Sequence, residues 1–238
     1  MRRLVAVVLG AALGRPLGAQ GPVEPGYRAG WGDAATVTAA GVFYVLPSAL
    51  GLPKGGPSCG PCDPGALPGF DRWAVGPVAN GPDVASDVVL GAVAAWTAVS
   101  GLQGLPARVW RGNVAMFANT ASWTAAATAW LKVAVRRKRP VLYTSGAGAA
   151  LSDPESQQSF PSLHTSLAFA AATSYLVVSA REHLPHRTRN ALLLAAGAVA
   201  VGALRVASAQ HFPSDVVGGA VLGAGLGWLV PTVHPSTP

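Results

Sequence analysis

The chain has 238 residues, of which half are hydrophobic and 11% are charged. Soluble domains carry about 25% charged residues. The composition therefore excludes intrinsic disorder and favours a helical membrane protein or a very apolar helical globule. The net charge of +7 indicates an anionic partner. We expect no nucleic-acid partner, because the basic residues form no long stripe and no nucleic-acid motif accompanies them.

The N-terminus has the layout of a secretory signal. Arg2 and Arg3 precede an apolar run of ten residues, and small residues follow up to Gln20. This order predicts a signal peptide over residues 1–19. An apolar run of this length is too short to cross a bilayer, so the alternative is an uncleaved anchor in the membrane interface. Either form predicts that part of the chain is exported.

Residues 20–83 are expected to hold one helix over 34–52, followed by a loop rich in Gly and Pro. Cys59 and Cys62 lie in that loop with two residues between them. The same spacing occurs in thioredoxin-type redox pairs, but no alternation of strands and helices surrounds it here. In an exported protein the pair is predicted to form a small structural disulfide, with thiol redox chemistry as the alternative.

Apolar segments without strand-like alternation predict an all-α fold, a membrane-embedded bundle of five or six helices after the signal segment. The predicted helices cover 34–52, 84–102, 109–135, 164–180, 191–206 and 215–230. Residues 84–230 would form the catalytic bundle and 231–238 a short tail. Small residues such as Gly219 and Gly223 let helices approach closely. A soluble all-α core is the alternative, because 109–135 and 164–180 are comparatively polar.

Positive charges predict an orientation. Basic residues gather in two linkers, at Arg108, Arg111, Arg181, Arg187 and Arg189. The positive-inside rule makes these linkers cytoplasmic and the other end of the bundle external. A cleaved signal combined with a spanning helix at 34–52 would invert this topology, so one of the two is excluded. Export and the Ala- and Gly-rich composition favour a bacterial inner membrane, with the site on the external or periplasmic side.

Three polar clusters interrupt the apolar sequence on the predicted external side. Their residues are Lys132 with Arg139 and Pro140, then Pro161 to His164, then Arg205, His211 and Asp215. Lys132, Arg139 and Arg205 would repel one another unless an anion lay between them. Arg presents a planar fork to phosphate oxygens, and Lys presents a point charge. The backbone N–H groups at the start of the helix after Pro161 also favour an anion.

The two histidines and the aspartate supply reactive groups. Asp215 lies four residues after His211, close enough to hold one imidazole nitrogen and leave the other as a nucleophile. His164 is suited to protonate a leaving alkoxide. Each residue alone has a simpler interpretation, such as a snorkelling Lys132 or a helix cap at Asp215. Together they predict a phosphate site with a nucleophile and an acid.

The pattern Lys-x6-Arg-Pro, Pro-Ser-x-His and Arg-x5-His-x3-Asp resembles the type 2 phosphatidic acid phosphatase (PAP2) superfamily, which includes bacterial acid phosphatases and vanadium haloperoxidases. The resemblance covers residues 84–230 and departs from the usual pattern twice. Leu163 stands where Gly is usual, and Leu204 stands where Ser usually precedes the third-motif Arg. Arg136, Arg137 and Lys138 lie outside the motifs and are expected to attract an acidic headgroup or to lie in a solvated loop.

The resemblance implies a PAP2-like membrane phosphatase that hydrolyses a lipid phosphate or pyrophosphate without a metal or other cofactor, with vanadate able to act as a phosphate mimic. His211 would form a phosphohistidine, Asp215 would orient it, and His164 would protonate the leaving oxygen. The phosphate would be bound by Lys132, Arg139, Ser162, Leu163 and Arg205. The alternatives are a soluble exported acid phosphatase, a vanadate-dependent haloperoxidase, and a phospholipid-binding protein without activity. The sequence does not encode the oligomeric state.

Overall fold

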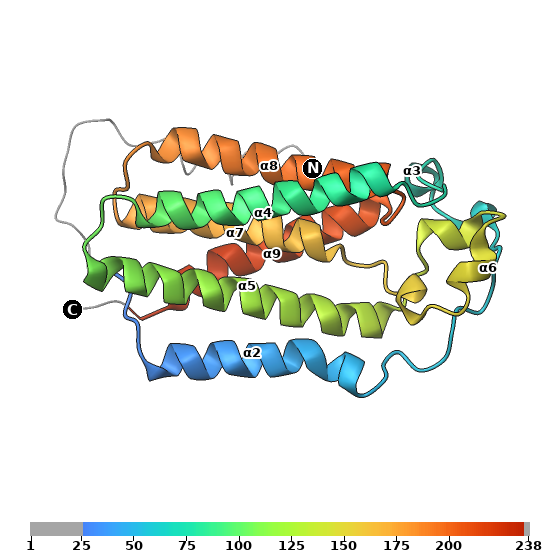
Figure 1. The fold of residues 1–238 in the computed structure, drawn as a ribbon, viewed down its shortest axis with the longest axis horizontal. Coiled ribbons are helices and arrows are strands. Elements are labelled where there is room, and N and C mark those ends of the chain that lie inside the picture. The colour runs from blue at the N-terminus through green and yellow to red at the C-terminus, as the bar shows by residue number, and fades with distance from the viewer. Residues whose placement is uncertain (1–25, 236–238) are drawn as a thin grey trace.

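A computed structural model describes residues 26–235, and the predicted signal over 1–19 lies outside this range. Six long helices run side by side along the molecule (Figure 1). They are α2 (Trp31–Ala49), α4 (Asn80–Leu102), α5 (Ala107–Val135), α7 (Leu163–Arg181), α8 (Arg187–Ala207) and α9 (Pro213–Val233). The described residues form no β-strand. The predicted all-α bundle is therefore confirmed.

Each helix begins one to four residues before the predicted segment. The predicted segments follow the apolar runs, whereas several helices include a polar or proline-containing first turn before the run. In α9, Pro213 is the first residue, and the Asp215 carboxylate accepts a hydrogen bond from the Phe212 N–H at 2.8 Å. Such a bond satisfies a donor that the helix itself leaves free. At the other end α9 continues to Val233, into the predicted tail.

Two connections at one end of the bundle contain the short helices. The first holds η1 (Pro64–Ala66) and α3 (Gly69–Arg72), and the second holds η2 (Pro140–Tyr143), α6 (Ala147–Ala150) and η3 (Pro154–Gln157). Cys59 and Cys62 form a disulfide in the first connection. The Cys62 N–H donates to the Leu142 carbonyl at 2.7 Å, and both side chains pack with Ala147. These contacts fasten the first connection to the second.

Helices α7 and α9 pack closely along a row of glycines. Gly219, Gly223 and Gly227 are spaced by four residues and share one face of α9. A Cβ atom at Gly223 would lie 2.0 Å from the Ser166 carbonyl oxygen of α7, and one at Gly219 would lie 2.6 Å from the Ser162 carbonyl. Larger residues would push the two helices apart. This close approach fixes the start of α9 against the start of α7.

The buried threonines of α5 form their hydrogen bonds within the helix. Thr120, Thr124 and Thr128 are buried, and each hydroxyl donates to the carbonyl four residues earlier, at 3.0, 2.7 and 2.7 Å. Such bonds allow Thr in a buried helix without a further partner. The polarity of this segment is therefore compatible with a position inside an apolar bundle.

Four of the described helices are long and apolar enough to cross a membrane: α4, α7, α8 and α9. Large apolar side chains are exposed on the outer faces of α4, α8 and α9, including Val88, Val99, Leu192, Val199, Val217, Val221 and Trp228. A membrane would cover such faces. The linkers α4–α5 and α7–α8 lie at the end opposite the short helices (Figure 1).

Candidate active site

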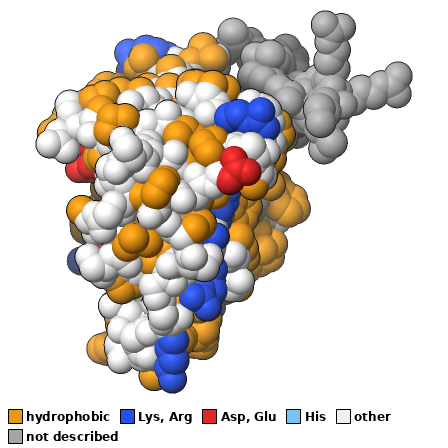
Figure 2. Space-filling model, turned by 90° about the vertical axis from the view of Figure 1, so that its right-hand side faces the viewer, with side chains coloured by type: hydrophobic (Ala, Val, Ile, Leu, Met, Phe, Trp, Pro, Cys, Tyr) orange, Lys and Arg blue, Asp and Glu red, His pale blue; other side chains and the backbone are white. Residues whose placement is uncertain are grey.

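The three predicted clusters meet at the end of the bundle that carries the short helices (Figure 1). They meet because successive helices alternate in direction. Lys132 and Arg205 lie in the last turns of α5 and α8, and Asp215 lies in the first turn of α9. Figure 2 views the molecule from this end and shows mostly hydrophobic or uncharged surface, with Lys and Arg side chains along one edge.

His211 lies between α8 and α9 and is 2% exposed. Its Nδ1 is 2.7 Å from the Ser159 carbonyl oxygen, which can only accept a hydrogen bond. Nδ1 therefore carries the proton, and Nε2 keeps its lone pair. Burial lowers the pKa of His211 to about 3, and the nearby cations act in the same direction. The imidazole is neutral at pH 7, the form that a nucleophile requires.

Asp215 acts on this imidazole indirectly. Its Oδ2 accepts hydrogen bonds from Ser159 Oγ at 2.6 Å and from the Phe212 N–H at 2.8 Å. The same oxygen is 3.8 Å from His211 Nδ1, beyond hydrogen-bonding distance. The sequence predicts that Asp215 holds one imidazole nitrogen, but the Ser159 carbonyl takes that position. Asp215 instead holds Ser159 by its hydroxyl and lies near the ring as a buried negative charge.

Lys132 lies in the last turn of α5, and Arg139 lies on the second connection, just before η2. Lys132 Nζ donates to the Gln158 carbonyl at 2.6 Å. Arg139 donates to the Gln210 side-chain oxygen, and its Nη2 is 3.6 Å from the Glu155 carboxylate. Glu155 is 71% exposed, so this ion pair is weak. Both cations can therefore exchange these partners for an incoming anion.

Arg205 is almost fully buried, at 5% exposed. It donates to the Asp83 carboxylate and, at 3.2 Å, to Ser86 Oγ. Its Nε is buried and has no partner among the described residues, and the same holds for the Nε of Arg139. Buried donors without acceptors are costly. A phosphate would supply oxygen acceptors for both guanidinium groups.

His164 lies in the first turn of α7 in more open surroundings than His211. Its side chain is 27% exposed, and its Nε2 is 2.7 Å from Asp87 Oδ1 of α4. A carboxylate partner and access to solvent suit an imidazole that exchanges protons. Asp87 is absent from the predicted site. Its signal in the sequence is an acidic residue inside an apolar segment of a chain with only 10 acidic residues.

Ser162 and Leu163 begin α7 and have different surroundings. Ser162 is fully buried; its hydroxyl accepts a hydrogen bond from Thr165 at 3.0 Å, and its N–H donates to the Asp215 carbonyl at 3.1 Å. Ser162 thus ties the start of α7 to the start of α9, which the sequence does not predict. Leu163 lines the cavity described next.

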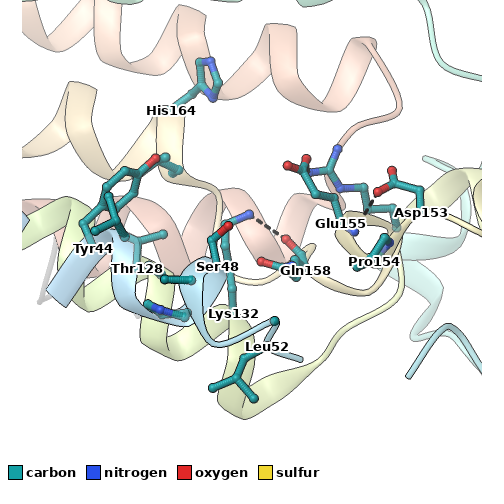
Figure 3. A pocket seen from close by; sticks show the side chains of 17 residues that line it. Tyr44, Ser48, Leu52, Thr128, Lys132, Asp153, Pro154, Glu155, Gln158 and His164 are labelled. Carbon is teal, nitrogen blue, oxygen red and sulfur yellow. Dashed lines mark hydrogen bonds and ion pairs between the residues drawn. The ribbon is translucent and has the colours of Figure 1, made fainter. Parts of the chain in front are cut away.

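A cavity of about 950 Å³ opens beside the cations (Figure 3). Lys132, Arg139 and His164 lie on its walls, and acidic Asp153 and Glu155 lie at the far side from His164. An apolar wall comes from α2 and the residues just after it: Tyr44, Val45, Pro47 and Leu52. The cavity therefore joins a cationic region to an apolar one.

Arg137 corrects one prediction. We expect this residue in a solvated loop or at a lipid headgroup, but its side chain is only 20% exposed. Its guanidinium bridges two buried carboxylates, with Nη1 2.6 Å from Asp215 and Nη2 2.6 Å from Asp71. The pair Arg137–Asp71 joins positions 66 residues apart. No local spacing in the sequence reveals such a contact.

The fold and the site together define a class of protein: an all-helical protein with four membrane-length apolar helices and, at one end, a buried histidine among cations. The family model of the PAP2 superfamily matches residues 113–237, more than half of the chain. The chain therefore belongs to the PAP2 superfamily, as its motifs predict. Helices α2 and α4 and the connection that carries Asp71 precede the matched region. Comparisons with curated proteins and with solved structures give no match.

Proposed function

We propose that this protein is a membrane phosphatase that hydrolyses a lipid phosphate or lipid pyrophosphate through a phosphohistidine on His211. Membership of the PAP2 superfamily supports a phosphatase-type activity. One observation carries the more specific proposal: the buried imidazole of His211 is neutral, has one defined tautomer and lies near cations with open donors.

In the first step, the lone pair of His211 Nε2 attacks phosphorus, and the bond from phosphorus to the leaving oxygen breaks. The Nδ1 proton stays on its hydrogen bond to the Ser159 carbonyl and keeps the ring oriented. His164 gives a proton to the leaving oxygen. The leaving group is a lipid alcohol from a monoester, or a lipid monophosphate from a pyrophosphate.

In the second step, water attacks the phosphohistidine. His164, now neutral, takes a proton from the water, and the phosphorus–nitrogen bond breaks to release inorganic phosphate. Lys132, Arg139 and Arg205 stabilise the negative charge on the phosphoryl oxygens in both steps. We propose that these three cations supply the charge stabilisation that a metal ion supplies elsewhere.

The shape of the cavity supports a lipid substrate. The wall formed by Tyr44, Val45, Pro47 and Leu52 lies beside Lys132 and His164. A hydrocarbon chain along this wall would leave water, which is favourable by about 25 cal/mol per Å². The basic linkers at the opposite end of the bundle favour an external active site in a bacterial inner membrane.

The test compares detergent-purified wild type with His211→Ala in EDTA. The substrates are phosphatidate, an isoprenoid pyrophosphate and a water-soluble aryl phosphate. We expect wild type to release phosphate from a lipid more than about 10³-fold faster than the variant, because the nucleophile is lost. Release from the aryl phosphate alone would assign a soluble-type phosphatase. Release from none of the three would overturn the proposed function, and equal release by the variant would overturn the phosphohistidine.

A further inference from the structure

We propose that Asp71 and Arg137 are positioning residues, which hold Asp215 and the start of α9 so that Nε2 of His211 faces the phosphate site. This inference rests on the proposed function of His211 as the nucleophile. Neither residue belongs to the three motifs, and Asp71 lies outside the region that the family model matches.

Arg137 connects the two carboxylates by a fork of hydrogen bonds. Its Nη1 donates to Asp215 Oδ1 and its Nη2 to Asp71 Oδ2, both at 2.6 Å. The two aspartate side chains are 0% and 1% exposed. Two buried carboxylates this close would repel each other without a shared cation. The guanidinium also donates from Nη1 to the Ser214 hydroxyl and lies 4.7 Å from the centre of the Phe212 ring, so four contacts fix its position.

Asp71 also holds the first turn of α9 directly. Its Oδ1 accepts a hydrogen bond from the Ser214 N–H at 3.0 Å, and its Oδ2 accepts one from the Ser214 hydroxyl at 2.7 Å. The first N–H groups of a helix have no partner within the helix, so Asp71 caps α9 from a distant segment. It therefore fixes Ser214 directly and Asp215 through Arg137.

The connection that carries Asp71 is itself well fastened. The Arg72 side chain donates to the carbonyl oxygens of Pro64, Gly65 and Leu67. Leu67 and Ala74 pack in a buried cluster with Phe212, which directly follows His211. The segment around Asp71 is thus a support built against the residue next to the nucleophile.

The chain of contacts ends on the imidazole. Asp215 accepts the Ser159 hydroxyl hydrogen bond, and the Ser159 carbonyl accepts the Nδ1–H of His211. Arg139 and Arg205 have other partners, Gln210 and Asp83. Loss of Asp71 or Arg137 should therefore disturb the aim of Nε2 and leave the binding of a phosphate by the cations intact.

The binding of two inorganic anions, phosphate and orthovanadate, would distinguish a change in the orientation of His211 from a change in the cations. Phosphate needs only the cations, whereas orthovanadate readily becomes five-coordinate and takes an axial nitrogen ligand, here His211 Nε2. Calorimetry in detergent would measure both affinities for wild type, Asp71→Asn and Arg137→Gln. The matched control is Asp63→Asn, because Asp63 lies in the same connection, is exposed and caps only η1. A small displacement of a reacting group lowers the reaction rate by up to about 10²-fold.

We expect Asp71→Asn and Arg137→Gln to weaken vanadate binding by about 10- to 100-fold, to leave phosphate binding nearly unchanged, and to lower kcat more than they raise KM. Because the two residues act as one unit, the double variant should be little worse than the poorer single variant. Arg137→Lys keeps the charge without the fork and should lie between wild type and Arg137→Gln. If Arg137→Gln fails to fold, Arg137→Lys takes its place in the binding comparison.

Three results would overturn the inference: equal loss of phosphate and vanadate binding, vanadate binding unchanged in both variants, or wild-type vanadate affinity no greater than that of His211→Ala. A wild type that releases no phosphate from any lipid would instead overturn the proposed function. The comparison of vanadate with phosphate would still decide the positioning role in that case, because it needs no turnover.

Discussion

Both ends of the bundle bury a histidine beside an aspartate, but the two histidines differ in the nitrogen they leave open. At the end away from the site, His234 Nε2 is 2.6 Å from Asp33 Oδ1, and its Nδ1 is 3.1 Å from the Pro235 carbonyl. At the site end, the described residues give His211 a hydrogen-bond partner at Nδ1 only. The first histidine is fully bonded, whereas the second keeps a lone pair for chemistry.

The aspartates beside these two histidines, Asp33 and Asp215, also differ in their partners. Asp33 also accepts hydrogen bonds from the Asn119 amide and the Gly30 N–H, both at 2.9 Å, and so ties α2 to α5 and to the residue after α9. Asp215 instead shares a cation, Arg137, and holds the residue that orients the nucleophile. Under the proposed function, a His–Asp pair is structural where every polar atom is satisfied, and reactive where one nitrogen is left open beside cations.

The largest predicted effect tests the difference between His211 and His234 directly. His211→Ala should lower turnover of the preferred lipid by more than about 10³-fold, because it removes the nucleophile. His234→Ala should leave kcat nearly unchanged and lower the free energy of unfolding by about 1–3 kcal/mol, because Asp33 loses a buried partner. Phosphate release and thermal unfolding in detergent would measure the two effects. Equal losses of turnover in the two variants would contradict the distinction.

Asp87→Asn should have the next largest effect. The Asp87 carboxylate accepts a hydrogen bond from Nε2 of His164 and fixes the orientation of the ring. Without this bond, general acid catalysis by His164 should become less efficient. Such catalysis contributes about 10²–10⁴-fold to a rate, so we expect kcat to fall by about 10- to 100-fold. The control is Asp33→Asn, which removes the carboxylate charge beside His234 at the opposite end of the bundle. An unchanged kcat in Asp87→Asn would exclude Asp87 from proton transfer.

The lowered pKa of His211 predicts that its imidazole does not titrate between pH 8 and pH 5. Because burial lowers this pKa to about 3, the imidazole should stay neutral from pH 8 to pH 5, where an ordinary histidine titrates near 6.5. Histidine-labelled NMR spectra, assigned with His211→Ala, would show the resonance unchanged over this range. The unfolded chain binds a proton near pH 6.5 and the folded chain does not, so this group destabilises the fold as the pH falls below 6.5. A midpoint near 6.5 would contradict the buried assignment.

The features of the molecule that can be predicted are those that leave a local pattern in the sequence. Apolar runs reveal the six long helices, and short spacings bring Lys132 and Arg139, or His211 and Asp215, to one end. The remaining contacts depend on tertiary packing. The Ser159 carbonyl that orients His211 comes from 52 residues away. Asp63 and Asp71 lie in the same connection, yet one is exposed and the other is fully buried.

The smallest predicted effect concerns Leu163, which stands where the family usually has Gly. Leu163→Gly keeps the N–H at the start of α7 but removes an apolar side chain from the cavity wall. The KM for a lipid phosphate should rise by about three- to tenfold, roughly half of the transfer free energy of a Leu side chain, while kcat changes little. Leu204→Ser, the other departure from the family pattern, does not touch the cavity lining and should leave KM unchanged. If Leu163→Gly, but not Leu204→Ser, leaves the KM for a lipid unchanged and lowers the KM for a soluble aryl phosphate, Leu163 narrows the entrance and does not contact the hydrocarbon chain.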